Sequence, residues 1–288
     1  MKRADFRFLD PLRVRWAEVD MQRIVFNGHY LMYFDTAVAG YWRAMGMPYH
    51  ETMEALAGDF YVRKATLEYA GPARYDDRLA VGIRLLRMGN SSMTLGAACF
   101  RGEEALVTGE LVYVFADPST MTSRPLPPAL REWFAAFEAG EGMWSTRTGT
   151  WAEMAASTRP LRRAVLVDEC GLDPQVEEDA DDAAAIHAVA CNRMGLALAT
   201  GRMVSRGEGE ARTGQIGRMV ASASLRGGGA GTAVLQALCQ AARAQSARRI
   251  ELESVTEAVP LYARQGFRPS APPFQRGDWT LQPMSAEV

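Results

Sequence analysis

Residues 20–30 read DMQRIVFNGHY, and they decide how the first half of the chain folds. Before them, residues 12–19 (LRVRWAEV) alternate apolar and polar side chains, as a half-buried strand does. After them, apolar residues recur every three or four positions up to Met45, which predicts a largely buried helix that begins near Gly28. The quoted segment is therefore a strand-to-helix turn that carries an aspartate, Asp20.

Strand-like runs follow the helix and are separated by glycine-containing turns. They cover residues 59–69, 78–88, 91–100 and 104–115, and a short amphipathic helix is expected over 127–138. One long helix followed by a meander of long strands predicts an α+β domain, an antiparallel sheet around a helix, over residues 1–139. The Gly-, Ser- and Thr-rich stretch 140–158 is expected to be a linker.

The second half alternates element types, which predicts an α/β domain over residues 159–288 with helices on the faces of a mixed sheet. Strands are expected at 162–168, 184–191, 195–204, 215–222 and 249–254, and helices at 230–246 and 257–265.

The bulk composition is that of a globular protein. The chain has 288 residues, enough for two domains, with 48% hydrophobic and 23% charged residues. The formal charge of -2 gives no electrostatic reason to expect nucleic acid or a membrane surface as a partner. The four cysteines are scattered without metal-ligand spacing, so reduced thiols, no metal site and a cytoplasmic location are expected.

A glycine-rich loop, residues 226–235 (RGGGAGTAVL), follows one predicted strand and opens an apolar helix. Glycines allow backbone N–H groups to converge on a phosphate, and the start of a helix adds partial positive charge. This context favours pyrophosphate binding over the alternative, a tight turn without a ligand.

Asp20 is a candidate for different chemistry. A carboxylate at the end of a strand that faces a helix start can be partly desolvated and can act as a nucleophile or as a base for water. Unpaired N–H groups at the helix start, near Asn27 and Gly28, could hold a developing oxyanion. On these grounds alone, a plain helix cap or turn is the better explanation of Asp20.

The second half resembles the GNAT acetyltransferase superfamily over about residues 160–288. Arg226, Gly229 and Gly231 fit its phosphate-loop pattern, and a later signature is matched by Ala258, Tyr262 and Gly266-Phe267. The resemblance implies attack of an amine on acetyl-CoA in a ternary complex. The implied cofactor-binding residues are Met219 and Val220, through backbone groups, and Arg226, Gly227, Gly228, Gly229, Ala230, Gly231 and Thr232.

The same resemblance implies that Tyr262 protonates the leaving thiolate, although an aromatic residue of the core is the alternative. No general base is identifiable. His187 falls in a strand pattern and is expected to be structural, and the acidic segment 177–182 is expected to be an exposed loop rather than an amine-steering site.

The first half resembles the hotdog-fold thioesterases of the 4-hydroxybenzoyl-CoA thioesterase group over about residues 8–138. Its motif is matched by Trp16, Glu18, Asp20, Val25, Phe26 and Tyr30, and a second stretch by residues 72–77 (PARYDD). The resemblance implies that Asp20 is catalytic and that the N–H of Asn27 polarises the thioester carbonyl. Arg23 stands where the family usually has glycine, so either the turn differs or Arg23 contacts phosphate.

Together these features predict an acyl-CoA thioesterase fused to an acetyltransferase, with CoA thioesters and an unidentified amine as substrates and no tightly bound cofactor. The alternative is a thioesterase with a non-catalytic, CoA-binding GNAT module. A homodimer or homotetramer through the hotdog domain is expected, since that family pairs its protomers.

Overall fold

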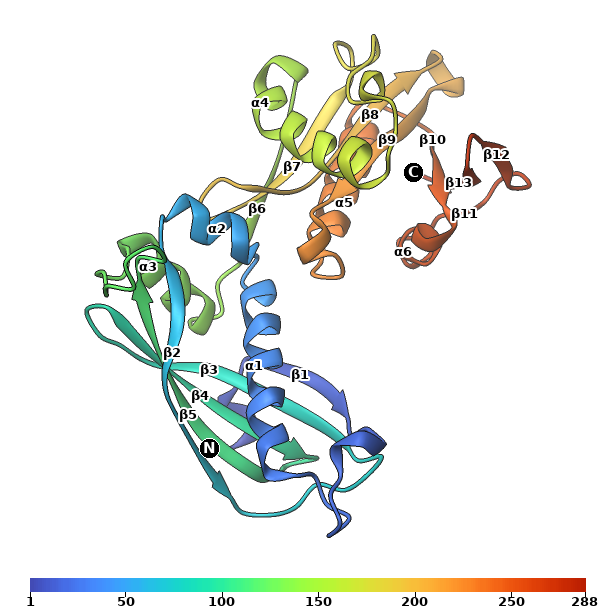
Figure 1. Cartoon of the computed structure of the whole chain (residues 1–288). Coiled ribbons are helices and arrows are strands. Elements are labelled where there is room, and N and C mark those ends of the chain that lie inside the picture. Colours follow the sequence, from blue (N-terminus) through green and yellow to red (C-terminus); the bar gives the residue numbers. More distant parts are fainter. The chain divides into compact units, whose positions relative to one another are not determined.

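The computed structural model describes the backbone of residues 1–288 and every side chain except those of Val176 and Glu210. The chain forms two compact units, Met1–Met143 and Trp144–Val288 (Figure 1). Each unit has a sheet of its own, so the two are described separately.

The N-terminal unit is an antiparallel sheet with one long helix lying on it (Figure 1). The strand order is β1-β3-β4-β5-β2. The elements in chain order are β1 (Phe8–Arg13), α1 (Asn27–Ala44), α2 (Tyr49–Ala55), β2 (Asp59–Tyr69), β3 (Arg78–Met88), β4 (Ser92–Arg101), β5 (Glu104–Ala116) and α3 (Pro128–Glu138).

The apolar side of α1 explains why this helix lies on the sheet. Phe34 and Tyr41, two turns apart, have no exposed surface; burial of such side chains contributes roughly 1.5–3 kcal/mol each. Gly109 of β5 makes room for the Phe34 ring. A Cβ at this position would lie 2.7 Å from the carbonyl oxygen of Thr66 and 3.2 Å from that ring. A larger residue at position 109 would push the helix and sheet apart.

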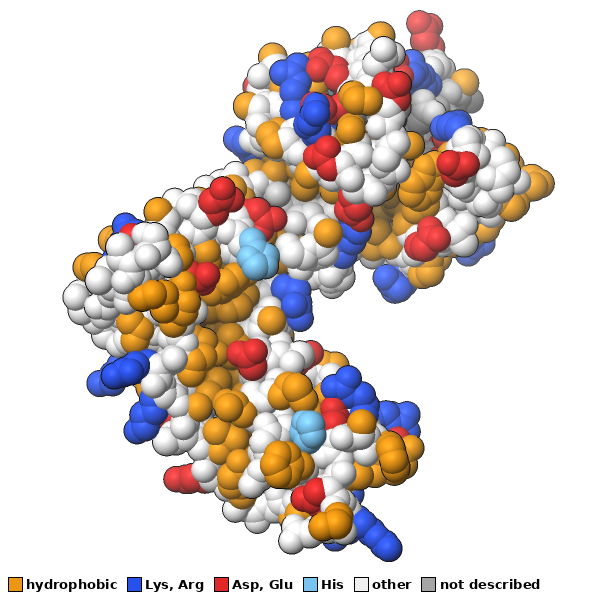
Figure 2. Space-filling view, viewed as in Figure 1, with side chains coloured by type: hydrophobic (Ala, Val, Ile, Leu, Met, Phe, Trp, Pro, Cys, Tyr) orange, Lys and Arg blue, Asp and Glu red, His pale blue; other side chains and the backbone are white. Residues whose placement is uncertain are grey.

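Hydrophobic side chains also stay exposed along α1 and β2. Leu31 and Met32 lie on the helix, and Val62 and Tyr69 lie on β2, which is an edge strand. Figure 2 shows such side chains gathered on this face of the N-terminal unit. An exposed edge strand with apolar residues beside it is a surface on which another chain can pack.

The C-terminal unit is a mixed sheet in the order β11-β13-β10-β9-β8-β7-β6, with β12 paired to β13. Among the strand pairs described, β9 and β10 run parallel and the others antiparallel. The elements are β6 (Trp144–Gly149), α4 (Trp151–Arg162), β7 (Ile186–Asn192), β8 (Ala197–Arg206), β9 (Thr213–Ala221), α5 (Ala230–Ala244), β10 (Arg249–Val255), α6 (Val259–Arg264), β11 (Arg268–Pro269), β12 (Phe274–Arg276) and β13 (Trp279–Glu287).

Helices cover both faces of this sheet. Along β7, Ala188 and Ala190 belong to the core beneath α5, whereas Val189 and Cys191 pack against Met154 of α4. Successive strand residues point to opposite faces, so α4 and α5 lie on opposite sides. Each apolar residue of this strand is therefore buried by one helix or the other.

Most predicted elements are confirmed, including α1, the four long strands after it and α5. The strand expected over residues 12–19 is wrong beyond Arg13, where β1 ends, because Trp16–Glu18 forms a 3₁₀ helix. Residues 140–158, expected to link the domains, instead form β6 and most of α4. A Thr150–Glu153 capping box starts α4, with the Thr150 N–H donating to Glu153 Oε2 at 2.7 Å. The strand expected at 162–168 is wrong, because Arg163–Glu169 is π-helical and Leu161 and Val165, four residues apart, pack together beside Val220.

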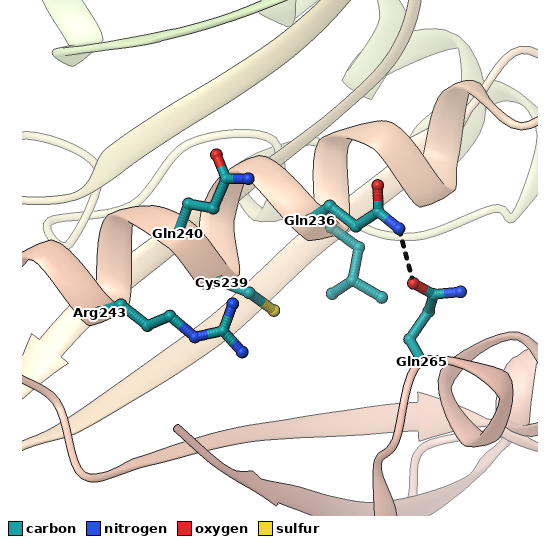
Figure 3. A pocket seen from close by; sticks show the side chains of 6 residues that line it. Gln236, Cys239, Gln240, Arg243 and Gln265 are labelled. Atoms are coloured by element: carbon teal, nitrogen blue, oxygen red, sulfur yellow. Dashed lines mark hydrogen bonds between the residues drawn. The ribbon is translucent and has the colours of Figure 1, made fainter.

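A shallow groove of about 330 Å³ runs along α5 and is lined by Gln236, Cys239, Arg243 and Gln265, among others (Figure 3). The side-chain amides of Gln236 and Gln265 join across it at 2.9 Å. Burial raises the pKa of the Cys239 thiol, so this cysteine stays protonated and is a poor nucleophile. None of the residues with a predicted catalytic role lines the groove.

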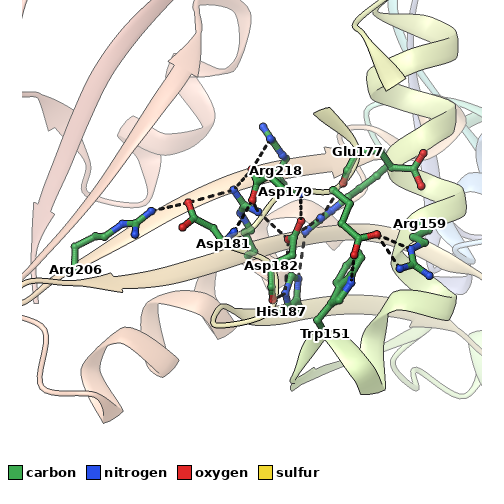
Figure 4. A network of polar contacts seen from close by, with 12 residues as sticks. Trp151, Arg159, Glu177, Asp179, Asp181, Asp182, His187, Arg206 and Arg218 are labelled. Atoms are coloured by element: carbon green, nitrogen blue, oxygen red, sulfur yellow. Dashed lines mark hydrogen bonds and ion pairs between the residues drawn. The ribbon is translucent and has the colours of Figure 1, made fainter. Parts of the chain in front are cut away.

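A network of ion pairs holds the acidic segment 177–182 onto the sheet (Figure 4). Arg202 donates to both oxygens of Asp179, at 2.5 and 2.7 Å, and lies 2.8 Å from Asp182. Arg162, which has no exposed surface, donates to Asp182 at 2.9 Å. The expected exposed acidic loop is therefore wrong, since arginines hold these carboxylates.

His187 lies beneath this network and is fully buried, as its strand pattern predicted. Its Nε2 is 2.9 Å from the carbonyl oxygen of Asp182, and its ring lies 4.8 Å from that of Trp151. Burial lowers the pKa of His187, which keeps the imidazole neutral. His187 is thus a structural residue.

The network predicts acid sensitivity of the C-terminal unit. The hydrogen bonds from Arg202 lower the pKa of Asp179 to about 2. A lowered folded-state pKa contributes stability above the unfolded value, about 3.8, which is lost as the pH falls toward about 2. Asp179→Asn should lower the free energy of unfolding at neutral pH by about 1–3 kcal/mol and flatten its decline between about pH 5 and pH 2.

Urea unfolding of the wild type and the variant at several pH values measures this effect. Asp278→Asn, at an exposed position of the same unit, is the control and should keep the wild-type pH profile. If the free energy of unfolding of Asp179→Asn coincided with that of the wild type at every pH, the Asp179–Arg202 pair would contribute nothing to stability.

Candidate active sites

The turn that carries Asp20 is closed by backbone hydrogen bonds. Val19 and Val25 form an isolated bridge, and the Asp20 N–H donates to the carbonyl oxygen of Ile24 at 2.9 Å. The Asp20 carboxylate is half-buried and accepts the N–H of Gln22 at 2.7 Å. One oxygen thus fixes the side chain and leaves the other for chemistry.

Arg23 adopts the conformation that glycine favours, with a φ of 61°. Its N–H donates to the Asp20 carbonyl oxygen at 2.9 Å, which closes the turn. The turn at Arg23 is therefore one that a glycine could also form, and both expectations for Arg23 stay predictions. An arginine there costs some backbone strain that a glycine would avoid.

The start of α1 presents free N–H groups beside this turn. The Phe26 N–H donates to the Glu18 carbonyl oxygen at 3.0 Å, and the His29 N–H donates to Phe26 at 2.9 Å. In the part of the chain that the structure describes, no acceptor faces the N–H of Asn27 or of Gly28. The Val19–Val25 bridge therefore ties the Asp20 turn to a helix start with two available donors.

Glu18 anchors this arrangement, a role that the sequence did not reveal. Its side chain is buried, accepts the Tyr33 hydroxyl at 2.7 Å and accepts both the N–H and Nε of Arg15 at 2.7 Å. Burial opposes ionisation, but the hydrogen bonds from Arg15 and Tyr33 keep the pKa of Glu18 below its usual value. An ionised Glu18 fixes the short 3₁₀ helix Trp16–Glu18 to α1. The motif match at Glu18 was the signal available in the sequence.

The glycine-rich loop of the C-terminal unit leads from β9 into α5. Gly227 and Gly229 have φ values of 82° and 98°, in the left-handed region, and Gly229 directly precedes the helix. The N–H groups of Ala230, Gly231 and Thr232 have no acceptor among the described residues. A Cβ on Gly231 would meet nothing within 4 Å, so the space before the helix start is open.

Arg226, the first residue of this loop, already forms an ion pair. Its guanidinium makes a two-pronged ion pair with Glu169, with both N–O distances 2.6 Å. That hydrogen bond lowers the pKa of Glu169. The Arg226 side chain thus fastens the loop to the π-helical segment Arg163–Glu169, and the backbone of the loop is what remains for a ligand.

The two parallel strands next to the loop diverge. β9 and β10 pair from Thr213–Ile216 with Arg249–Leu252, but β9 continues to Ala221 and β10 to Val255. The backbone of residues 217–221 therefore has no partner on the β10 side. Met219 and Val220, predicted to offer backbone groups to a cofactor, lie in this unpaired stretch.

Tyr262 follows β10 on α6 and is buried in the same core as Ile216 and Leu252, the last paired residues of the diverging strands. Its ring lies 6.0 Å from that of Phe267 in an edge-to-face contact. Burial raises the pKa of Tyr262 to about 12, so the hydroxyl keeps its proton at neutral pH. A raised pKa makes the phenol a weaker acid, so this burial supports the core-aromatic role more than the acid role, and the acid role stays a prediction.

The described residues also limit the possible metal sites and membrane spans. No group of three or more His, Cys, Asp or Glu residues in this part of the chain could hold a metal ion. No described helix combines the length and the apolarity needed to cross a membrane.

Two family models match the chain, one in each unit. The thioesterase-like superfamily matches residues 14–134, and the acetyltransferase (GNAT) domain matches residues 179–288.

Individual relatives match the first unit. The acyl-CoA thioester hydrolase YbgC of Escherichia coli O6:H1 is 29% identical over 124 residues, 42% of this chain and 90% of that protein. A putative esterase of Aquifex aeolicus is 26% identical over 118 residues, 41% of this chain and 91% of that protein. The solved structure of the PA5185 protein of Pseudomonas aeruginosa has 28% identity and a TM-score of 0.42 over 47% of this chain and 94% of that chain. With both family models in place, the chain joins a thioesterase-like domain of the hotdog fold to a GNAT acetyltransferase domain.

Proposed function

We propose that each half of the chain acts on a CoA thioester, by hydrolysis in the N-terminal unit and by acetyl transfer to an amine in the C-terminal unit. One observation supports the proposal: in each unit, a helix start within a predicted motif has N–H groups that find no acceptor among the described residues. Helix starts suit the oxyanion of a thioester and the pyrophosphate of CoA. The similarity to YbgC, whose name gives acyl-CoA thioester hydrolysis, supports the first half of the proposal.

In the hydrolase site, Asp20 supplies the attacking oxygen, either its own or that of a water molecule it deprotonates. The attack forms a C–O bond at the thioester carbonyl, and the N–H groups of Asn27 and Gly28 stabilise the charge on the carbonyl oxygen. The C–S bond then breaks, and the CoA thiolate leaves and is protonated by water. If Asp20 attacks directly, water hydrolyses the resulting anhydride.

The first prediction concerns this carboxylate. Asp20→Asn should lower acyl-CoA hydrolysis by at least about 10²-fold, because an amide is neither a nucleophile nor a base at neutral pH. Release of free CoA from a panel of acyl-CoAs measures the rate. Asp35→Asn, at an exposed position of α1, is the control, and an unchanged melting temperature would show that both variants fold. Near-normal turnover by Asp20→Asn would refute the assignment.

The N-terminal unit is further proposed to assemble with a second copy of itself, as a homodimer or homotetramer. The support is the exposed edge of β2 with Val62 and Tyr69 and the neighbouring apolar side of α1 (Figure 2). Pairing of two such surfaces would bury apolar area that water otherwise covers.

In the transferase site, acetyl-CoA would lie with its pyrophosphate against the N–H groups of residues 227–232. Its pantetheine arm would follow the unpaired backbone of Met219 and Val220 into the gap between β9 and β10. The amine nitrogen attacks the acetyl carbon, the C–S bond breaks, and the thiolate takes the proton of Tyr262. The ammonium proton passes to water, and Tyr262 regains its proton from solvent.

A charge placed at the helix start tests the cofactor position. Gly231→Glu should weaken acetyl-CoA binding at this loop by about 10-fold or more, because a carboxylate would repel the pyrophosphate. Gly231→Ala is the matched control and should bind normally, since the space around a Cβ there is open. Protection of residues 222–235 from hydrogen exchange by acetyl-CoA reports on this loop alone. Equal protection in both variants would mean that the loop is only a turn.

Tyr262→Phe separates a working transferase from a CoA-binding module. The ring that packs against Phe267 is kept, so acetyl-CoA affinity should hardly change while acetyl transfer falls by about 10²- to 10⁴-fold. The acetylated amine, measured by mass spectrometry, is the readout, because hydrolysis cannot produce it. An equally active variant would make Tyr262 a core residue without a chemical role.

One observation favours the alternative of a non-catalytic GNAT module. Arginines hold the carboxylates of Asp179, Asp181 and Asp182, so none of them is a free base for the amine. Under this alternative the unit binds acetyl-CoA and no amine in a broad panel is acetylated.

A further inference from the structure

The ion-pair network under the acidic segment contains more positive than negative charge. Its guanidinium groups belong to Arg162, Arg202, Arg206 and Arg218, and its carboxylates to Asp179, Asp181 and Asp182. The neighbouring pairs Arg159–Glu178 and Arg163–Glu177 are balanced within themselves. Since His187 is neutral, the network holds one cation in excess.

Arg218 is the member whose charge is least compensated. Among the described residues, its hydrogen bond runs from Nη2 to Asp179 Oδ2 at 2.8 Å, and Arg202 already occupies both oxygens of that carboxylate. The Nε of Arg218 is buried without an acceptor. Figure 4 shows that Arg218 joins the network through Asp179. More than a quarter of the side chain, 28%, is exposed, so a ligand can reach its outer end.

The backbone at Arg218 has an unusual conformation. Its φ is 52°, in the left-handed region that a residue with a long side chain rarely adopts. The pairing of β8 with β9 shifts register here, between Thr200 and Arg202, which marks a bulge. Strained residues and bulges occur preferentially at functional sites, where they re-aim a side chain.

The position of Arg218 places this charge beside the proposed reaction. It precedes Met219 in the stretch of β9 that has no partner on β10. Met219 packs against the α5 core, whereas Arg218 pairs with Asp179 in the segment that follows α4. The guanidinium therefore lies on the α4 side of the gap, the side opposite α5 and its glycine-rich loop.

We propose that Arg218 binds the carboxylate of the acceptor, so that the C-terminal unit acetylates amino acids rather than simple amines. The proposal rests on the acetyl-transfer function proposed above and names its substrate class. A planar carboxylate matches the donor geometry of a guanidinium and supplies the negative charge that the network lacks. With the carboxylate held at Arg218, the amine one carbon away is directed into the gap between β9 and β10.

The experiment compares each common amino acid with its amide, which keeps the amine and loses the negative charge. Acetylated product is measured by mass spectrometry for the full chain with acetyl-CoA. The wild type should prefer the acids, and Arg218→Met should lower kcat/KM for them by about 10- to 100-fold, chiefly through KM. The amides should react equally with both proteins. An aminoalkylphosphonate arm tests whether phosphonate replaces carboxylate, and equal or better use of it would overturn the choice of carboxylate.

Two further variants serve as controls. Arg206→Met removes an arginine of the same network that pairs with Asp181 at 2.6 Å, and it should keep the preference for acids. Arg218→Lys keeps the charge and should restore part of the preference. Loss of the preference in Arg206→Met as well would assign it to the fold of the network and overturn the role of Arg218.

Binding is measured separately, as the rise in melting temperature caused by each acid and amide in the presence of CoA. A rise with acids that Arg218→Met abolishes, without any acetylated product, supports the carboxylate site and refutes the transferase function. Equal effects of acids and amides, or no effect of either with no product, overturn the inference.

Discussion

The first N–H groups of an α-helix have no partner within the helix, and both candidate sites depend on where this chain places two such helix starts. In the N-terminal unit, the Val19–Val25 bridge and the ionised Glu18 hold the start of α1 beside Asp20. In the C-terminal unit, left-handed glycines turn the chain so that the start of α5 faces open space. Under the proposed function, the same backbone property would serve an oxyanion in one half and a phosphate in the other.

Arginine pairing organises the second site around that helix start. Arg226 forms an ion pair with Glu169. Arg202 pairs with Asp179, and Arg162 pairs with Asp182. These pairs connect the π-helical segment and the acidic segment to the sheet. The buried pair among them, Arg162–Asp182, adds little net stability, since desolvation offsets its attraction, but losing one partner is costly. Their contribution is to hold one arrangement of loops around the diverging strands.

The sequence was informative wherever periodicity or a motif reports on local structure. The steps of three and four along α1 follow directly from which face is buried, and glycine-containing turns separate the runs that form β2 to β5. Predictions from the sequence were wrong where tertiary contacts decide the secondary structure or the exposure of a segment. Residues 162–168 look like a buried strand, yet Leu161 and Val165 need helical spacing to reach Val220. The acidic run 177–182 looks solvated, because its arginine partners come from distant strands and from α4. Motifs located Glu18, Asp20, Tyr262 and the glycine loop, but the contacts by which Glu18 and Glu169 anchor their segments appear in no local pattern.

The way the second unit begins limits how the two halves can be separated. Trp144 is its first residue, packs into the α5 core and lies 3.5 Å from where a Cβ on Gly229 would stand. A fragment beginning at residue 159, where the GNAT resemblance starts, would lack β6, the edge of the sheet, and most of α4. Cleavage after residue 150 would therefore remove Trp144 and β6, which border the glycine-rich loop. The compact C-terminal unit is thus longer than the stretch matched by the GNAT family model, and it begins at Trp144 rather than at residue 179.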